Sequence, residues 1–159
     1  MNKAKFVQAV IDHLKEKVSQ YLGAAKAAHA EATHEESKAE DKYDTRGLEA
    51  SYLAAGQARQ MEEMAQALQQ FASMVVPKFG SKDPIDVGAL VEVKTKEGDA
   101  AYFVGPSAGG TEIVHAQKPV LVITPQSPLG QQLVGRKQGD KLKIKIAGRQ
   151  NEYHITSVT

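Results

Sequence analysis

The sequence predicts an α+β protein, in which an N-terminal antiparallel helical coiled-coil hairpin precedes a small antiparallel β-sheet domain with one short helix. Three observations support this. Residues 1–76 contain no proline and repeat apolar side chains at helical spacing. Residues 77–86 contain two prolines and a glycine, which stop a helix and mark a linker. From residue 87 to residue 159, period-two alternation and β-branched residues predominate, as expected for strands.

The composition limits the class of protein. The chain has 159 residues, with 42% hydrophobic and 25% charged residues, so wholesale disorder is not expected. The absence of cysteine excludes disulfides and thiolate metal sites and is consistent with a reducing compartment. No apolar run of about 18 residues is present, so we expect no membrane-spanning helix and no contact with a membrane.

Two amphipathic helices are expected on either side of a short acidic stretch. In the first, apolar residues and alanines recur every three or four positions, at Val7, Val10, Leu14, Val18, Tyr21, Ala25, Ala28 and Ala32. In the second, the stripe passes through Leu48, Tyr52, Ala55, Ala58, Met61, Ala65, Leu68, Ala72 and Val75, with Phe71 beside it. If Val18 pairs with Met61, small side chains face small ones and large side chains face large ones along the two helices. This pairing places the turn near Ala39. Arms of about 30 residues would reach about 45 Å.

The turn region is acidic. Residues 31–44 contain six acidic residues and two lysines, and the predicted tip is residues 35–44. Thr33 with Glu36, and Ser37 with Glu40, both fit the capping-box spacing. Acids near a helix start are also favoured by the helix dipole. Glu36, Glu40 and Asp41 therefore have an ordinary interpretation as solvated capping residues, beside a functional one as oxygen ligands.

The second half contains the strand signals. Strands are predicted at residues 90–94, 101–104, 120–123, 141–146 and 153–158. A short helix should begin after Ser127 as its cap and Pro128 in its first turn, and should end before Gly135. Lys141, Lys143 and Lys145 would share one strand face, either as a solvated surface or as an electrostatic patch for an acidic partner or nucleic acid.

These residues resemble a known family. Residues 124–140 contain a serine and proline, a short helix that ends at Gly135 before Lys137, and then Asp140, which opens a β-hairpin. The hairpin closes with residues 153–158. This pattern is similar to the C-terminal domain of the bacterial GreA/GreB transcript-cleavage factors, and the helical half is collinear with the rest of that family.

The resemblance implies a cytoplasmic factor whose coiled coil enters the secondary channel of RNA polymerase. The C-terminal domain, FKBP-like in fold, would grip the channel rim, with Gln126, Ser127 and Pro128 as contact residues. Tip acids would help to hold a catalytic Mg²⁺, which prefers oxygen ligands, so that the polymerase cuts its own backtracked RNA. The protein would contact nascent RNA only indirectly and would stimulate the polymerase nuclease without being an enzyme itself. Ser127 and Pro128 also have a purely structural interpretation as helix caps.

The tip differs from the family pattern. Aligned on Tyr43 and Tyr52, Glu36 falls on the first functional acid and Ala39 falls on the second, with Glu40 one position away. A second hypothesis is therefore a regulator that binds the secondary channel without stimulating cleavage. A third is a stand-alone isomerase or chaperone module, which the few aromatic residues of the second half disfavour.

Overall fold

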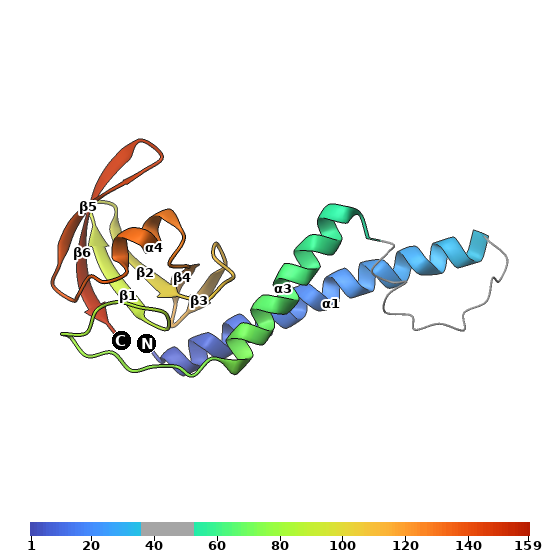
Figure 1. Ribbon diagram of the computed structural model, residues 1–159, viewed down its shortest axis with the longest axis horizontal. Helices are drawn as coiled ribbons and strands as arrows, with labels where there is room; N and C mark the ends of the chain where they lie inside the picture. The colour runs from blue at the N-terminus through green and yellow to red at the C-terminus, as the bar shows by residue number, and fades with distance from the viewer. Residues whose placement is uncertain (36–52) are drawn as a thin grey trace. The chain divides into compact units, whose positions relative to one another are not determined.

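The computed structural model describes residues 1–35 and 53–159 (Figure 1). The elements are α1 (Lys3–Glu35), α3 (Ala55–Ser73), β1 (Leu90–Thr95), β2 (Gly98–Val104), β3 (Glu112–His115), β4 (Lys118–Ile123), α4 (Pro128–Leu133), β5 (Lys141–Ile146) and β6 (Arg149–Val158). The α+β class is confirmed. The predicted turn near Ala39 lies outside the described residues. None of the helices among residues 1–35 and 53–159 is both long and apolar enough to cross a membrane.

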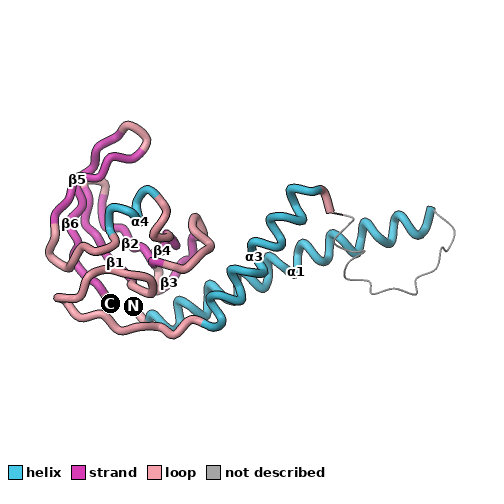
Figure 2. Tube along the Cα trace, in the orientation of Figure 1, coloured by secondary structure: helices cyan, strands magenta, loops and turns pink. Residues whose placement is uncertain are grey.

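The chain forms two compact units. One contains Met1–Val10 together with Gln70–Thr159, and the other contains Ile11–Gln69. The first unit therefore includes the sheet, the start of α1 and the end of α3. Residues 74–89, between α3 and β1, contain neither helix nor strand (Figure 2).

Helix α1 follows its predicted stripe. Its first turn is capped by Asn2, whose Oδ1 accepts a hydrogen bond from the Lys5 backbone N–H at 3.1 Å. Val7, Val10, Leu14 and Ala25 are all buried, at the three-to-four-residue spacing of one helix face.

Helices α1 and α3 run antiparallel. The start of α1 and the end of α3 both contact the same ring of the sheet, through Phe6 and Phe71. Further along, the Tyr21 hydroxyl donates to Gln60 Oε1 at 2.7 Å. This pairing lies two residues from the register that the pairing of Val18 with Met61 predicts.

The predicted stripe of α3 is confirmed in part, since Ala58, Met61 and Leu68 are half-buried as expected. The buried residues of α3 are Ala67 and Phe71, whereas Ala72, expected in the stripe, is exposed. The Phe71 ring packs against the sheet, and this contact decides which side of the helix turns inward. Val75, the last expected member, is 88% exposed because α3 ends at Ser73, shortly before the proline that closes the helical segment.

The sheet has six strands in the order β3-β4-β2-β1-β6-β5. All five predicted strands are present. The expectation of a wholly antiparallel sheet was wrong, because β2 and β4 pair in parallel. The cause is the unpredicted strand β3, which forms an antiparallel hairpin with β4 and so reverses the chain before β4 pairs with β2. Strand β3 has only four residues, too few for a clear alternation.

One sheet face packs against α4 and the preceding loop. Its core includes Ile85, Val91, Leu133, Ile144 and Ile155, all of which are at most 1% exposed. Tyr102 packs at the edge of this core. Burial, with neighbouring Tyr153 as a second cause, raises the pKa of Tyr102 above its usual value.

The opposite face packs against the helix ends. The Phe103 ring lies 5.2 Å from the Phe6 ring and 6.2 Å from the Phe71 ring, between centroids. Leu90 and Val122 lie directly across from Phe103 on the two neighbouring strands, and both are buried. These aromatic and aliphatic contacts attach Met1–Val10 and the end of α3 to the sheet.

Lys3 contacts two residues of the segment between α3 and β1. Its Nζ donates to the Pro77 carbonyl oxygen and lies 4.9 Å from the centroid of the Phe79 ring. Burial lowers the pKa of Lys3. The side chain thus connects the first turn of α1 to the segment that follows α3.

Phe103→Ala should lower the free energy of unfolding by about 3–5 kcal/mol, since it removes a fully buried ring that contacts Phe6 and Phe71. Urea denaturation would measure the change. Val114→Ala, at a 72% exposed position, is the control and should change it by less than about 0.5 kcal/mol. Equal losses in the two variants would contradict the second core.

Candidate partner-binding site

The turn between β4 and α4 positions Gln126, Ser127 and Pro128. The Ser127 hydroxyl donates to the Thr124 carbonyl oxygen at 2.7 Å and accepts from the Gly130 backbone N–H at 3.0 Å. Pro128 occupies the first turn, where its missing N–H costs nothing. The predicted capping by Ser127 is confirmed.

The three residues differ in what they present to solvent. Gln126 and Pro128 are exposed, whereas Ser127 is half-buried and its hydroxyl already has two partners. The Gln126 backbone oxygen accepts a hydrogen bond from Gln131 Nε2 at 3.2 Å, which holds the turn and leaves the Gln126 side chain exposed. Gln126 and Pro128 are therefore the residues best placed to contact a partner, and that role remains a prediction.

Close packing at Gly130 holds α4 against the turn. A Cβ atom at this position would lie 1.8 Å from the Thr124 carbonyl oxygen and 2.9 Å from Ser127 Oγ. No side chain fits there, although the position lies within a helix. The sequence analysis did not single out this residue, but a glycine inside a predicted helix is a signal of close backbone approach.

The other end of α4 is tied to the loop that precedes β1. The Ile85 N–H donates to the Arg136 carbonyl oxygen at 2.7 Å, and the Gly135 N–H donates to the Ile85 carbonyl oxygen at 2.8 Å. Asp140, expected to open the hairpin, accepts from the Lys137 N–H through Oδ2 at 2.9 Å. Hydrogen bonds thus hold both ends of α4, through side chains at the turn of residues 126–128 and through the backbone at residues 135 and 136.

The predicted tip carboxylates of Glu36, Glu40 and Asp41 lie outside the described residues, as do Tyr43 and Tyr52. Within residues 1–35 and 53–159, no group of three or more histidine, aspartate or glutamate side chains is placed to hold a metal ion.

Comparison with known proteins adds to these observations. Residues 81–159 match the family described as "Transcription elongation factor, GreA/GreB, C-term". Two curated relatives, both named transcription elongation factor GreA, come from Streptococcus pyogenes serotypes M5 and M3. Each is 30% identical over 92 residues, which is 56% of this chain and 53% of the relative. The chain therefore spans about half the length of the curated relatives it matches.

Two solved structures are also similar. The GreA factor homolog 1 protein of Thermus thermophilus is 19% identical, with 95% of each chain covered and a TM-score of 0.40. A GreA/GreB elongation factor from Nitrosomonas europaea is 18% identical, covers 71% of this chain and 88% of its own, and has a TM-score of 0.37.

These observations define a class of α+β protein. It has long N-terminal helices, followed by a mixed sheet and a short helix that begins with a proline. The matched region contains the whole of the sheet and the turn at residues 126–128. Within this class, residues 81–159 of the chain form a C-terminal domain of the GreA/GreB family.

Gly130→Ala should lower the free energy of unfolding by about 1–3 kcal/mol, because the added methyl group overlaps the Thr124 carbonyl oxygen. The same substitution at Gly23, within α1, meets no atom within 4 Å and should raise stability by up to about 1 kcal/mol. Thermal unfolding of both variants shows whether each substitution lowers or raises stability. A stabilised Gly130→Ala variant would show that the turn is not closely packed.

Proposed function

We propose that this protein is a transcription elongation factor that acts on RNA polymerase through the polymerase secondary channel. The observation that carries the proposal is the match of residues 81–159 to a family described as a transcription elongation factor. The antiparallel course of α1 and α3 supports it, because two paired helices can carry the acidic sequence between them into a channel.

In this proposal the acidic sequence between the helices supplies ligands. Glu36, Glu40 and Asp41 contribute carboxylate oxygens, the donor type that Mg²⁺ prefers, to a site completed by the polymerase. Mg²⁺ bound there would supply Lewis-acid activation for hydrolysis of the backtracked RNA. The chain itself orients carboxylates and contacts nascent RNA only through this shared site. Cleavage therefore belongs to the polymerase, and the protein is a stimulator without an active site of its own.

The second contact in the proposal is the turn at residues 126–128. Exposed Gln126 and Pro128 meet the channel rim, while Ser127 keeps its capping hydrogen bonds. A turn held by hydrogen bonds suits a binding surface, because little conformational entropy is lost when it binds.

The alternative is a regulator that occupies the secondary channel without stimulating cleavage. The observation that favours it is the tip sequence, in which Ala39 stands where the family pattern has its second functional acid. Such a protein would alter initiation or pausing and leave the RNA length unchanged.

The combined variant Glu36→Ala, Glu40→Ala and Asp41→Ala should lose the stimulation of RNA cleavage. We expect a fall of about 100-fold or more in the cleavage rate, because metal-assisted stabilisation is worth several kcal/mol. The assay uses stalled elongation complexes with end-labelled RNA, resolved by gel electrophoresis. Polymerase binding, measured in parallel, should remain within about twofold.

The matched control replaces three exposed acids of the described helices, Glu16, Glu31 and Glu62, with alanine. It changes the net charge equally and should retain cleavage. If the unaltered protein binds polymerase and shortens no RNA, the cleavage proposal is wrong and the regulator remains. If it does not bind polymerase at all, both are wrong.

Gln126→Ala combined with Pro128→Ala should weaken polymerase binding about tenfold, which corresponds to about 1.4 kcal/mol. Both side chains are exposed, so the melting temperature should change little. Fluorescence anisotropy of the labelled protein titrated with polymerase gives the affinity. Gln138→Ala, also exposed and beyond α4, is the control; equal weakening by the control would remove residues 126–128 from the interface.

A further inference from the structure

The sheet face that packs against the helix ends is covered over only half of its width. Over β2 and β4 it is apolar and buried, through residues such as Phe103, Val120 and Val122. Beyond Leu90 of β1, the same face over β1, β6 and β5 is polar, with exposed and half-buried side chains. Glu92 and Lys118 mark the border with an ion pair of 3.8 Å.

Lysines dominate the exposed half. We define the basic face as the five exposed lysines of β1, its following turn and β5, which are Lys94, Lys96, Lys141, Lys143 and Lys145. On β5 the lysines alternate with Leu142 and Ile144, which are buried on the other side, so all three point the same way.

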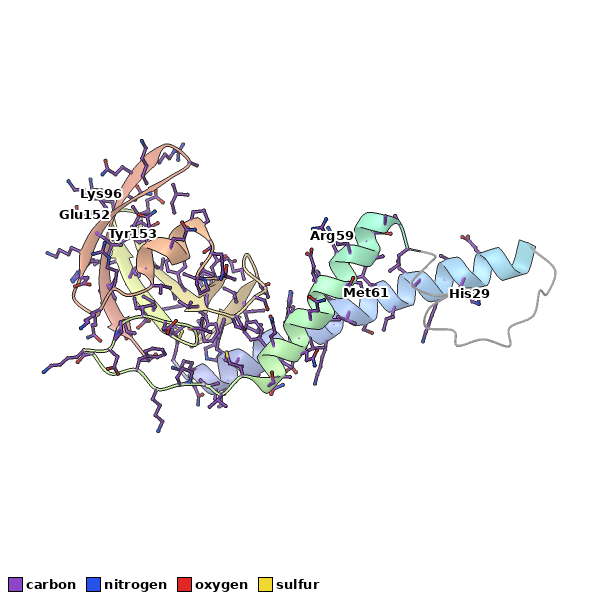
Figure 3. All side chains as sticks on the ribbon, viewed as in Figure 1. His29, Arg59, Met61, Lys96, Glu152 and Tyr153 are labelled. Atoms are coloured by element: carbon purple, nitrogen blue, oxygen red, sulfur yellow. The ribbon has the colours of Figure 1, made fainter. Side chains whose placement is uncertain are left out.

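Strand pairing brings the lysines of β1 and β5 together. His154 on β6 lies directly between Lys94 on β1 and Lys141 on β5. A shallow groove of about 290 Å³ passes over this row, lined by Lys94, Thr95, Lys96, Lys141, Glu152 and His154. Figure 3 labels Lys96 and Glu152 in this part of the sheet.

The basic face is only partly neutralised. Asp99 on β2 lies directly across from Lys94, and Glu152 on β6 lies across from Lys143. Glu97 follows Lys96 in the turn, so three acids lie near the five lysines. Within residues 1–35 and 53–159, none of the five lysines forms an ion pair. The three lysines of β5 lie on one side of a single strand, so their like charges repel each other and create a positive field above the sheet.

The composition favours a phosphate ligand over a protein surface. Lysine is depleted in protein–protein interfaces, where arginine and aromatic residues are enriched. Lysine also binds phosphate, as a point charge, although it lacks the two-pronged geometry by which arginine matches both carboxylates and phosphates. The groove residues include no aromatic side chain other than His154, so bases of a single strand have no platform on which to stack.

We propose that the basic face binds the phosphate backbone of duplex DNA without reading its sequence. Alternate residues of a strand lie about 6.8 Å apart, so the three β5 lysines extend over about 13 Å. A duplex presents a phosphate about every 1.7 Å along its axis over that length. This activity goes beyond the proposed action on polymerase and does not depend on it.

The test is fluorescence anisotropy of a labelled 20-base-pair duplex, titrated with the full chain between about 50 and 200 mM salt. Binding should be of the micromolar order typical of non-specific contacts, with a slope of log affinity against log salt of about −3 to −4. Lys141→Gln, Lys143→Gln and Lys145→Gln together should weaken binding about tenfold or more at the lowest salt. The same variant should make the slope less negative by about 2.7.

The control variant, Lys15→Gln, Lys26→Gln and Lys78→Gln, removes the same charge from exposed lysines elsewhere and should weaken binding less than about twofold. Circular dichroism melts confirm that both variants fold. Absence of duplex binding by the unaltered chain overturns the proposal, as does an equal loss in the two variants. Tighter binding of polyglutamate than of the duplex also overturns it, because the face would then fit an acidic protein partner.

Discussion

The packing of Phe103 between the ends of two helices is the contact on which the first compact unit depends. Phe6 comes from the first turns of α1 and Phe71 from the last turns of α3, so one ring of the sheet holds segments 65 residues apart in the sequence. Burying aromatic rings contributes several kcal/mol through apolar surface and ring contacts.

This contact also gives the sheet two different cores. Phe103 and its cross-strand neighbours pack against the helix ends, while the alternate residues of the same strands pack on the face that α4 covers. Strand β2 therefore has to be apolar on both sides, as are strands that are covered on both faces. Strand β5 is covered on one side only, and its lysines occupy the other.

The turn that leads into α4 shows how one position can serve both structure and binding. The Ser127 hydroxyl forms hydrogen bonds with two backbone groups, and Gly130 allows the helix to approach Thr124 closely. These two residues fix the turn, and Gln126 and Pro128 are left at its surface. The proposed contact with polymerase therefore uses Gln126 and Pro128, whose side chains are exposed.

Charge is distributed unevenly along the chain. One proposed activity uses an acidic segment, and the other uses a basic face. Residues 31–44 are acidic in sequence and suit a hard cation shared with a partner. The basic face gathers lysines from two segments that are about 50 residues apart, Lys94 and Lys96 on one side and those of β5 on the other. The near-neutral net charge of +1 conceals both features.

Local patterns in the sequence determined the α+β class, the course of α1, five strands and the cap of α4. Each of these features depends on spacing, turn residues or capping residues that are close together in the sequence, so it can be predicted without the tertiary structure. Only the tertiary structure decided the rest. The inward side of α3 depends on where the Phe71 ring packs, and the parallel pairing of β2 with β4 depends on the short strand β3. The gathering of Lys94 beside Lys141 required the strand order, which brings β1 and β5 to either side of β6 through pairing between distant segments.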